Sequence, residues 1–334
     1  MSQPTMTGPD AEHATDVVLR AEHLDVVYDG ERPLHAVRDV SLELRRGEIL
    51  GIAGEPGCGK STLAHAIGRT LRPPARLTRG RVTFHGRDAV ETDLTALRGE
   101  ELRAFRRNRL SMVFQSAMNA LNPVTTVGRQ FDDIFRAHRP RMAAGERRER
   151  ARELLATVGV DPELARGHPH ELSGGTRQRV VIAMALALDP EVVIMDEPTT
   201  ALDLVAQREI LDEIVGLRDR FGFSVVLVTH DLTPLLELSD RIAVMHAGRV
   251  VGHAPTARIA RGAAHPYPRG LPRSFPDPPV DGRLPPARPA PGAERTAVTT
   301  TPDVAGPTVD HRRRGRPPGR AAGRPAPEGG PSAA

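Results

Sequence analysis

The sequence of 334 residues is poor in several residue types. It contains one cysteine, Cys58, no tryptophan, and only 3% aromatic residues. A single cysteine excludes an internal disulfide and a thiolate-rich metal site built from this chain alone. Scarce aromatic rings and a formal charge of only +4 argue against a dedicated binder of single-stranded nucleic acid, because such proteins stack bases on aromatic side chains. No interaction with nucleic acid is therefore expected.

Long apolar runs are also missing from the sequence. No stretch approaches the roughly twenty apolar residues that a membrane-spanning helix needs. Residues 1–15 are polar and have no apolar signal-peptide core. These features predict a cytoplasmic protein, unless a partner holds it elsewhere.

Lysine is the scarcest basic residue. Among the 46 lysines and arginines, Lys60 is the only lysine, and it lies in the run Gly54-Glu55-Pro56-Gly57-Cys58-Gly59-Lys60-Ser61. This spacing is that of a phosphate-binding P-loop. A compact ammonium on a flexible stem fits inside a loop of backbone N–H groups, where a planar guanidinium is too broad. The run therefore predicts binding of a nucleoside triphosphate.

The flanking patterns supply the context that this motif requires. A short apolar strand at 48–53 leads into the loop, and a helix at 61–67 leaves it. Further near-continuous apolar strands are expected at 192–195, 224–228 and 241–245, separated by helices. Such strands indicate a mostly parallel sheet that is covered on both faces.

Other segments surround this predicted core. Residues 17–20, 24–28 and 36–44 alternate like strands, and residues 92–108 have a helical pattern. A polar helical stretch, about 116–178, interrupts the alternation and predicts an inserted helical subdomain. Residues 1–16 are expected to be a disordered leader, and the Pro/Arg/Gly-rich residues 272–334 a disordered tail.

Two carboxylates follow the predicted strand at 192–195. Asp196 stands where it could approach a magnesium ion together with the hydroxyl of Ser61. Glu197 comes directly after it and could orient or deprotonate an attacking water. Without the P-loop, an acidic pair that caps a strand would be the default interpretation.

A turn of small residues precedes a long apolar helix. Ser173, Gly174 and Gly175 would expose backbone donors and the positive end of the helix dipole, which suits a phosphate. An ordinary N-cap is the alternative, because serine is a good capping residue.

The order of these elements resembles that of an ABC-type ATPase over residues 17–271. The segments that resemble its Walker A, Q-loop, signature, Walker B, D-loop and switch elements are, in order, Gly54 to Ser61, Gln115, Leu172 to Gly175, Asp196 and Glu197, Ala201 to Asp203, and Thr229 to Asp231. The resemblance implies an α/β P-loop NTPase with a RecA-like, mostly parallel core sheet, an antiparallel β subdomain and an inserted helical subdomain. It also implies that two such domains pair head to tail, with each ATP between Lys60 of one and Ser173 of the other.

The resemblance also implies roles for individual residues. Glu197 and His230 would be catalytic, although His230 taken alone would more often be a surface histidine. Magnesium would be held by Ser61, Gln115 and Asp196. ATP would be bound by Tyr28, Gly54, Glu55, Pro56, Gly57, Cys58, Gly59, Lys60, Ser61, Thr62, Gln115, Ser173, Gly174, Gly175 and Asp203.

Two of these residues have alternative interpretations. Tyr28 would stack on adenine, and the alternative is a core or hairpin tyrosine. Cys58 would be a tolerated small side chain, and a partly exposed, electropositive position would make it reactive toward alkylating agents.

Two further segments narrow the resemblance. Residues 115–124 and the His265-Pro266-Tyr267 motif resemble segments of oligopeptide and dipeptide importer ATPases. That family implies two permease subunits, an extracytoplasmic solute-binding protein, a second ATPase subunit that is the same or a paralogue, and a peripheral position on the cytoplasmic face of the cell membrane. Import of nickel or oligosaccharides remains an alternative, as does a soluble ABC ATPase that acts on ribosomes or DNA. A cysteine-containing extension common in the family does not follow the motif, and a tail with Arg312 to Arg316 stands in its place.

Overall fold

The computed structural model describes residues 16–114, 120–200 and 202–260. The chain divides into two units, Met1–Pro278 and Pro279–Ala334, and every described residue belongs to the first unit. The predicted leader up to residue 15, the predicted tail, the His265 motif and Gln115 lie outside the described residues.

One sheet has four strands in the order β2-β1-β4-β5, and all its pairings are antiparallel. The strands are β1 (Val17–Tyr28), β2 (Leu34–Arg45), β4 (Ala75–His85) and β5 (Glu91–Asp93). The sequence pattern does not predict β4, and the prediction of a helix at residues 92–93 is wrong. Thr92 pairs with Phe84 of β4, and the helix α3 (Gly99–Asn108) begins only at Gly99.

The second sheet has six strands in the order β10-β9-β3-β8-β7-β6. They are β3 (Ile49–Gly54), β6 (Leu110–Val113), β7 (Val192–Asp196), β8 (Ser224–Val228), β9 (Arg241–His246) and β10 (Arg249–Pro255). All neighbours are parallel except β10 on β9, and every residue of β3, β7 and β8 is buried. The predicted α/β class, with a mostly parallel core sheet and a separate antiparallel sheet, is confirmed.

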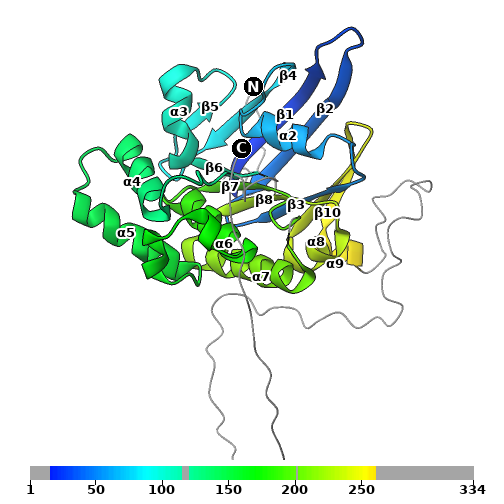
Figure 1. Ribbon diagram of the computed structural model, residues 1–334. Helices are drawn as coiled ribbons and strands as arrows, with labels where there is room; N and C mark the ends of the chain where they lie inside the picture. The colour runs from blue at the N-terminus through cyan, green and yellow to red at the C-terminus, as the bar shows by residue number, and fades with distance from the viewer. Residues whose placement is uncertain (1–15, 115–119, 201, 261–334) are drawn as a thin grey trace, which may run out of the picture. The chain divides into compact units, whose positions relative to one another are not determined.

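Helices cover both faces of the parallel sheet (Figure 1). The remaining helices are α2 (Lys60–Ile67), α4 (Val127–His138), α5 (Ala144–Thr157), α6 (Gly174–Leu186), α7 (Leu204–Phe221), α8 (Leu232–Leu238) and α9 (Thr256–Ala260), with short 3-10 turns η3 (Pro162–Arg166) and η4 (Pro169–Glu171). Helix α6 runs without a break through residue 178, where the sequence analysis ends the helical insertion. None of the helices within the described ranges is long and apolar enough to span a membrane.

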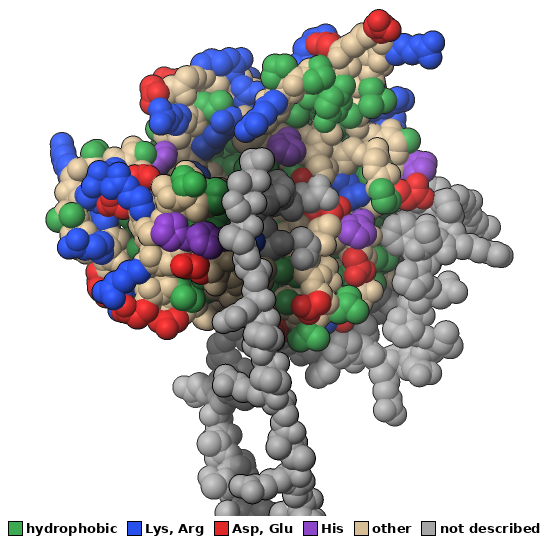
Figure 2. Space-filling model, in the orientation of Figure 1, with side chains coloured by type: hydrophobic (Ala, Val, Ile, Leu, Met, Phe, Trp, Pro, Cys, Tyr) green, Lys and Arg blue, Asp and Glu red, His purple; other side chains and the backbone are tan. Residues whose placement is uncertain are grey.

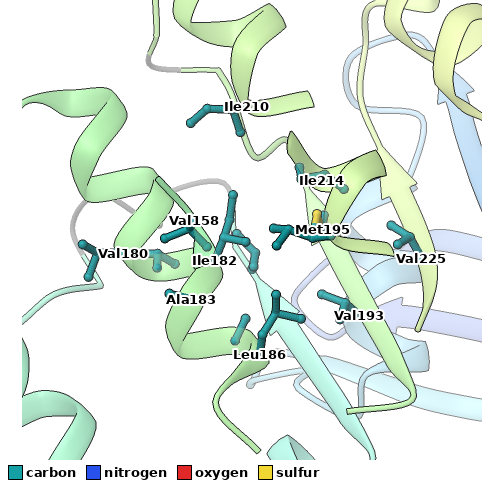
Figure 3. Close-up of a cluster of buried hydrophobic side chains, with 14 of the residues drawn as sticks. Val158, Val180, Ile182, Ala183, Leu186, Val193, Met195, Ile210, Ile214 and Val225 are labelled. Carbon is teal, nitrogen blue, oxygen red and sulfur yellow. The ribbon is translucent and has the colours of Figure 1, made fainter. Parts of the chain in front are cut away.

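Two apolar cores lie on opposite faces of this sheet. On one face, α2 packs between the parallel sheet and the antiparallel sheet, with Leu63 and Ile67 fully buried. On the other face, side chains of α6 and α7 pack on β7 and β8, as Ile182, Ile214 and Met195 show in Figure 3. Because β3, β8 and β7 are adjacent and parallel, their carboxyl ends lie at one edge of the sheet. The segments that follow these strands contain the predicted site residues Lys60, Glu197 and His230.

Candidate nucleotide site

The loop between β3 and α2 requires glycine at two positions where the backbone is crowded. Gly54 has φ 156°, and a Cβ there would lie 2.4 Å from the carbonyl oxygen of Met245. Gly59 has φ 106°, and a Cβ there would lie 2.2 Å from the carbonyl oxygen of Ala36. Both residues therefore combine positive φ with backbone contacts that leave no room for a side chain. Pro56 and Gly57 are exposed at the tip of the loop.

Lys60 crosses the inside of this loop. Its side chain is buried, and Nζ donates hydrogen bonds to the carbonyl oxygens of Gly54 at 2.8 Å and Glu55 at 2.9 Å. The ammonium is thus held at the centre of the loop by neutral acceptors only. A phosphate that enters the loop meets a positive charge whose position is already fixed.

Cys58 differs from its predicted setting. The residue is buried with 8% of its surface exposed, not partly exposed. Burial raises the pKa of its thiol, and the nearby Lys60 charge opposes that shift without cancelling it. The expected partial exposure is wrong, and burial together with a raised pKa argues against a reactive thiol, because a buried neutral thiol is a poor nucleophile.

Asp196 and Ser61 form a pair beside the loop. Ser61 Oγ donates to Asp196 Oδ1 at 2.9 Å, and Asp196 is 2% exposed. Burial raises the pKa of Asp196, and the hydrogen bond from Ser61 opposes this shift. A buried carboxylate next to a hydroxyl fits a hard divalent cation that takes its other ligands from water and phosphate oxygens. Within the described residues, no three His, Cys, Asp or Glu side chains gather as a metal-holding group.

Glu197 has an unusual backbone and well-defined side-chain partners. Its φ is 48°, in the left-handed region that non-glycine residues seldom adopt. Its Oε2 accepts a hydrogen bond from Thr200 Oγ1 at 2.8 Å, and its Oε1 lies 3.1 Å from Nδ1 of His230, which follows β8. Partial burial acts to raise the pKa of Glu197, but the donors Thr200 and His230 and the charge of Lys60 outweigh it and hold the pKa below its usual value. The carboxylate is therefore kept ionised next to the phosphate loop.

An open cleft of about 850 Å³ adjoins these groups. Tyr28, Ser61 and Asp196 lie on its wall, and Tyr28 OH is 3.1 Å from Thr62 Oγ1, on the first turn of α2. Arg72 and Arg106 also line the cleft, and Figure 2 shows Lys and Arg side chains gathered over α3 and the nearby β4. Positive side chains around a phosphate site favour the approach of an anionic nucleotide.

The Ser173 turn belongs to another part of the surface. Ser173 is exposed, and its Oγ accepts a hydrogen bond from Thr176 N at 3.1 Å as the N-cap of α6, where Gly174 and Gly175 form the first turn. Asp203 likewise caps α7 by accepting from Val205 N and Ala206 N, both at 3.0 Å. Among the described residues that line the cleft, none comes from the turn 173–175.

The structure thus brings some predicted residues together and leaves others apart. The P-loop, Asp196, Glu197 and His230 gather at one edge of the sheet, whereas Ser173 caps α6 and is not among the described residues that line the cleft. Asp203 caps α7, which follows the Glu197 loop in the chain. Thr200, which donates to Glu197, is not predictable from the sequence, because no spacing rule singles out a threonine three residues after a carboxylate.

His65 is a second residue of the cleft that the sequence pattern does not predict. It lies on α2 and in the wall of the cleft. Its ring stacks on Phe114 with centroids 5.4 Å apart, and its Nδ1 is 2.8 Å from Thr70 Oγ1. No sequence signal marks it, because the contact joins two segments that are far apart in the chain.

A phosphate loop that opens a helix, a strand-end carboxylate pair and a histidine from the neighbouring strand define the class of P-loop nucleoside triphosphatases.

The comparisons with known proteins narrow this class. A family model described as ABC transporter matches residues 37–200. A probable peptide ABC transporter ATP-binding protein of Sinorhizobium fredii is 43% identical over 266 residues, which cover 78% of each chain. A dipeptide transport ATP-binding protein of Caldanaerobacter subterraneus is 38% identical over 257 residues, or 76% of this chain and 77% of the relative.

A solved structure points the same way. An ATP-binding cassette, determined as a dimer in a post-hydrolysis state with ADP and phosphate, is 32% identical with a TM-score of 0.62. The match covers 71% of this chain and 98% of that chain. The chain therefore belongs to the ABC transporter family, binds ATP and is an ATPase.

Proposed function

We propose that this chain is the ATP-hydrolysing subunit of a membrane ABC importer and lies on the cytoplasmic face of the membrane. There it energises the uptake of peptides or a similar small solute into the cell. One observation carries the catalytic part of the proposal. Glu197 is held ionised between Thr200 and His230, one residue after Asp196 and beside the Lys60 loop. The peptide class rests on the names of the relatives, which include peptide and dipeptide transport ATP-binding proteins.

The P-loop and α2 hold the triphosphate in this proposal. Loop amides and Lys60 Nζ bind the β- and γ-phosphate oxygens, so the hydrogen bonds that Lys60 now makes to Gly54 and Glu55 are exchanged for stronger, charge-assisted ones. Tyr28 stacks on the adenine, with its hydroxyl anchored on Thr62. Glu55 to Thr62 thus contact the phosphates along one continuous stretch of chain.

Asp196 and Ser61 are the described residues that would hold a magnesium ion, and Gln115 is the third proposed ligand. The fit comes from the hydroxyl and carboxylate, whose oxygens already lie 2.9 Å apart, and from the burial of Asp196. Bound magnesium would neutralise charge on the β- and γ-phosphates. Among the described residues, no lysine or arginine is hydrogen bonded to the buried carboxylate of Asp196. A magnesium ion would therefore supply positive charge next to this carboxylate.

Glu197 orients the attacking water and accepts its proton as the γ-phosphate is transferred. His230 contacts the γ-phosphate and fixes Glu197 Oε1 from the other side, while Thr200 fixes Oε2. Both partners fix the direction of the carboxylate, and the charge of Lys60 also helps to keep its pKa low. The base therefore stays ionised and keeps a defined direction.

The Ser173 turn completes the nucleotide site of a second ATPase subunit. Ser173, Gly174 and Gly175 present a helix N-terminus to solvent, and such a terminus suits a phosphate. Asp203 and the exposed Leu204 and Val205, which are 82% and 70% exposed, lie at the start of α7 and suit the same contact. The second subunit is a copy or a paralogue, and two permease subunits and an extracytoplasmic solute-binding protein complete the proposed importer.

Substitution of Glu197 by glutamine in the assembled complex tests this proposal. We expect ATP affinity to stay within about twofold, while turnover and uptake of a labelled tripeptide into proteoliposomes fall at least about 100-fold, because the base is lost and the site is kept. Glu149→Gln, at an exposed position of α5, is the matched control and should leave both unchanged. Unchanged hydrolysis in Glu197→Gln would contradict the assigned role of Glu197, and hydrolysis stimulated by a sugar or by nickel, with no response to peptides, would contradict the substrate class.

A further inference from the structure

In the proposed pair of subunits, each nucleotide lies between the Lys60 loop of one chain and the Ser173 turn of the other, and we call this arrangement the composite site. Helix α6 follows the Ser173 turn, and helix α7 follows the loop that carries Glu197. Helix α6 begins at the Ser173 turn, and the N-cap of α7 is Asp203, six positions after Glu197. Their contact is mainly apolar, as Figure 3 shows for side chains of α6 and α7 around Met195. At the N-terminal ends, a Cβ on Gly175 would lie 4.0 Å from Ala206 Cβ. The hydrophobic driving force behind this contact is non-directional, and a polar contact adds a defined geometry to it.

Arg179 supplies the directional contact between these helices. Its Nε donates to Glu213 Oε2 at 2.9 Å, and a terminal nitrogen donates to Glu209 Oε2 at 3.2 Å. Glu209 and Glu213 are one helical turn apart on α7, so a single planar guanidinium holds two acceptors on one face of that helix.

This ionic contact is only partly open to solvent. The side chains of Arg179 and Glu213 are 28% and 16% exposed, whereas Glu209 is 59% exposed. Burial raises the pKa of Glu213, and the charge of Arg179 opposes this shift. Removal of Arg179 would therefore leave a partly buried carboxylate without its compensating charge, which costs more than the loss of an exposed pair.

The first turns of α7 are also tied to the loop that carries Glu197. Gln207 Nε2 donates to the carbonyl oxygen of Thr199 at 3.3 Å, and the next residue, Thr200, donates to Glu197 Oε2 at 2.8 Å. A continuous series of contacts therefore runs from α6 through Arg179 to α7, and from α7 to the catalytic carboxylate.

We propose that Arg179 is a positioning residue of the ATPase reaction. By holding Glu209 and Glu213, Arg179 fixes helix α6 on helix α7, and so it fixes the position of the Ser173 turn relative to Glu197. The Ser173 turn, which faces a second subunit, and the loop that carries Glu197 therefore move together. This inference rests on the proposed function, because the Ser173 turn matters for ATP only when a second subunit faces it.

The test uses the full chain with Glu197→Gln, in which bound ATP is not turned over. ATP affinity of the single chain and ATP-dependent dimerisation are measured by nucleotide fluorescence and sedimentation velocity. We expect Arg179→Ala to leave ATP affinity within about twofold and to weaken dimerisation about tenfold, the equivalent of one charge-assisted hydrogen bond. Arg179→Lys should recover part of the loss, because a lysine reaches one carboxylate but does not fork to two.

Arg150 provides the matched control. It is 30% exposed and also contacts two acids, Asp189 at 2.9 Å and Glu153 at 3.3 Å, but neither lies on α7. We expect Arg150→Ala to change neither quantity. Equal weakening by Arg150→Ala and Arg179→Ala would overturn the positioning role and leave only a general effect of lost ion pairs.

Amide hydrogen exchange in the single chain is the second readout. Arg179→Ala should raise exchange at residues 174–177 and 204–207 and leave α5 unchanged, whether or not the chain pairs with itself. Unchanged exchange and unchanged dimerisation would overturn the inference about Arg179 alone. If the Glu197→Gln parent binds ATP but never pairs, with itself or with a paralogue, the composite site fails, while the exchange data still decide whether Arg179 holds α6 on α7.

Discussion

The residues around Lys60 and the turn at Ser173 serve the same kind of nucleotide site in our proposal, yet they are built differently. Lys60 and Asp196 are buried, and Lys60 Nζ and Asp196 Oδ1 are hydrogen bonded within the chain. Ser173 is exposed, and the described contacts of its hydroxyl are with Thr176 of its own helix: the cap to Thr176 N at 3.1 Å and a contact with Thr176 Oγ1 at 2.8 Å. The first region is organised before any ligand arrives, whereas the second is a surface that needs another chain opposite it.

The two regions also differ in what they cost the fold. Asp196 is a buried charge whose pKa burial raises, and Glu197 adopts φ 48°. Both features oppose folding and are typical of sites that fix reactive groups in advance. Ser173, in contrast, is a favourable N-cap in an extended conformation. The phosphate side is therefore organised at the expense of stability, and the Ser173 side contributes to stability.

The largest expected effect comes from the preorganised side. Lys60→Arg keeps the charge but places a broad guanidinium in a loop that is lined by glycine backbone and carbonyl oxygens. We expect ATP hydrolysis to fall at least about 100-fold and ATP affinity to fall with it, because phosphate donors must lie at defined positions. Hydrolysis and equilibrium nucleotide binding are the measurements. The exposed exchange Arg103→Lys on α3 should change neither, and near-normal activity of Lys60→Arg would show that the loop needs only a positive charge.

A smaller effect is expected at the exposed Ser173 turn. Ser173→Ala removes the cap of α6 and should destabilise the chain by about 1 kcal/mol. It should lower hydrolysis by the paired subunits about tenfold and leave ATP affinity of the single chain unchanged, because the turn contacts only the facing nucleotide. Thr126→Ala is the matched control, since Thr126 caps α4 by accepting from Arg129 N at 3.4 Å. It should cost similar stability without loss of activity, and equal loss of activity in both variants would refute a specific role for Ser173.

The smallest effect concerns pH. Thr200→Val removes a donor to Glu197 Oε2, so the pKa of Glu197 should rise toward its usual value. The base must be ionised, and activity is lost as pH falls through its pKa, so the acidic limb of the kcat profile should move to higher pH while activity at neutral pH changes little. A pKa that is lower in the folded than in the unfolded state stabilises the fold above the unfolded-state pKa, and this stabilisation is lost as pH falls through the folded-state pKa. Because Thr200→Val raises the folded-state pKa of Glu197, it should reduce this contribution to stability. Thr157→Val on α5 is the control, and a limb that does not move would show that Thr200 does not act on Glu197.

The sequence predicted the phosphate side well because its signals are local. The strand at 48–53, the glycine loop and the helix after it are consecutive, and each shows its own pattern. Strand β4 was missed because five of its eleven residues in the middle, from Leu77 to Arg81, carry no buried apolar side chain. Residues 92–93 were then misassigned, since their strand exists only through pairing with β4.

Contacts between distant segments were beyond sequence reasoning. Arg179 and Glu213 are 34 residues apart, and Tyr28 and Thr62 are also 34 apart. Both contacts depend on how helices and strands pack, which no spacing within one element encodes. Even Thr200, only three residues from Glu197, reaches it because the backbone turns at φ 48°.

Because Lys60 is the only lysine of the sequence, this residue can be probed selectively by covalent labelling of amines. As the sole ε-amine in the sequence, its modification by an acylating reagent is read in a single proteolytic peptide. Because Nζ is buried and bonded to two carbonyl oxygens, the reagent can reach it only when the loop opens. The rate of labelling would report loop opening directly, and its suppression by ATP would give nucleotide occupancy by mass spectrometry without any engineered label.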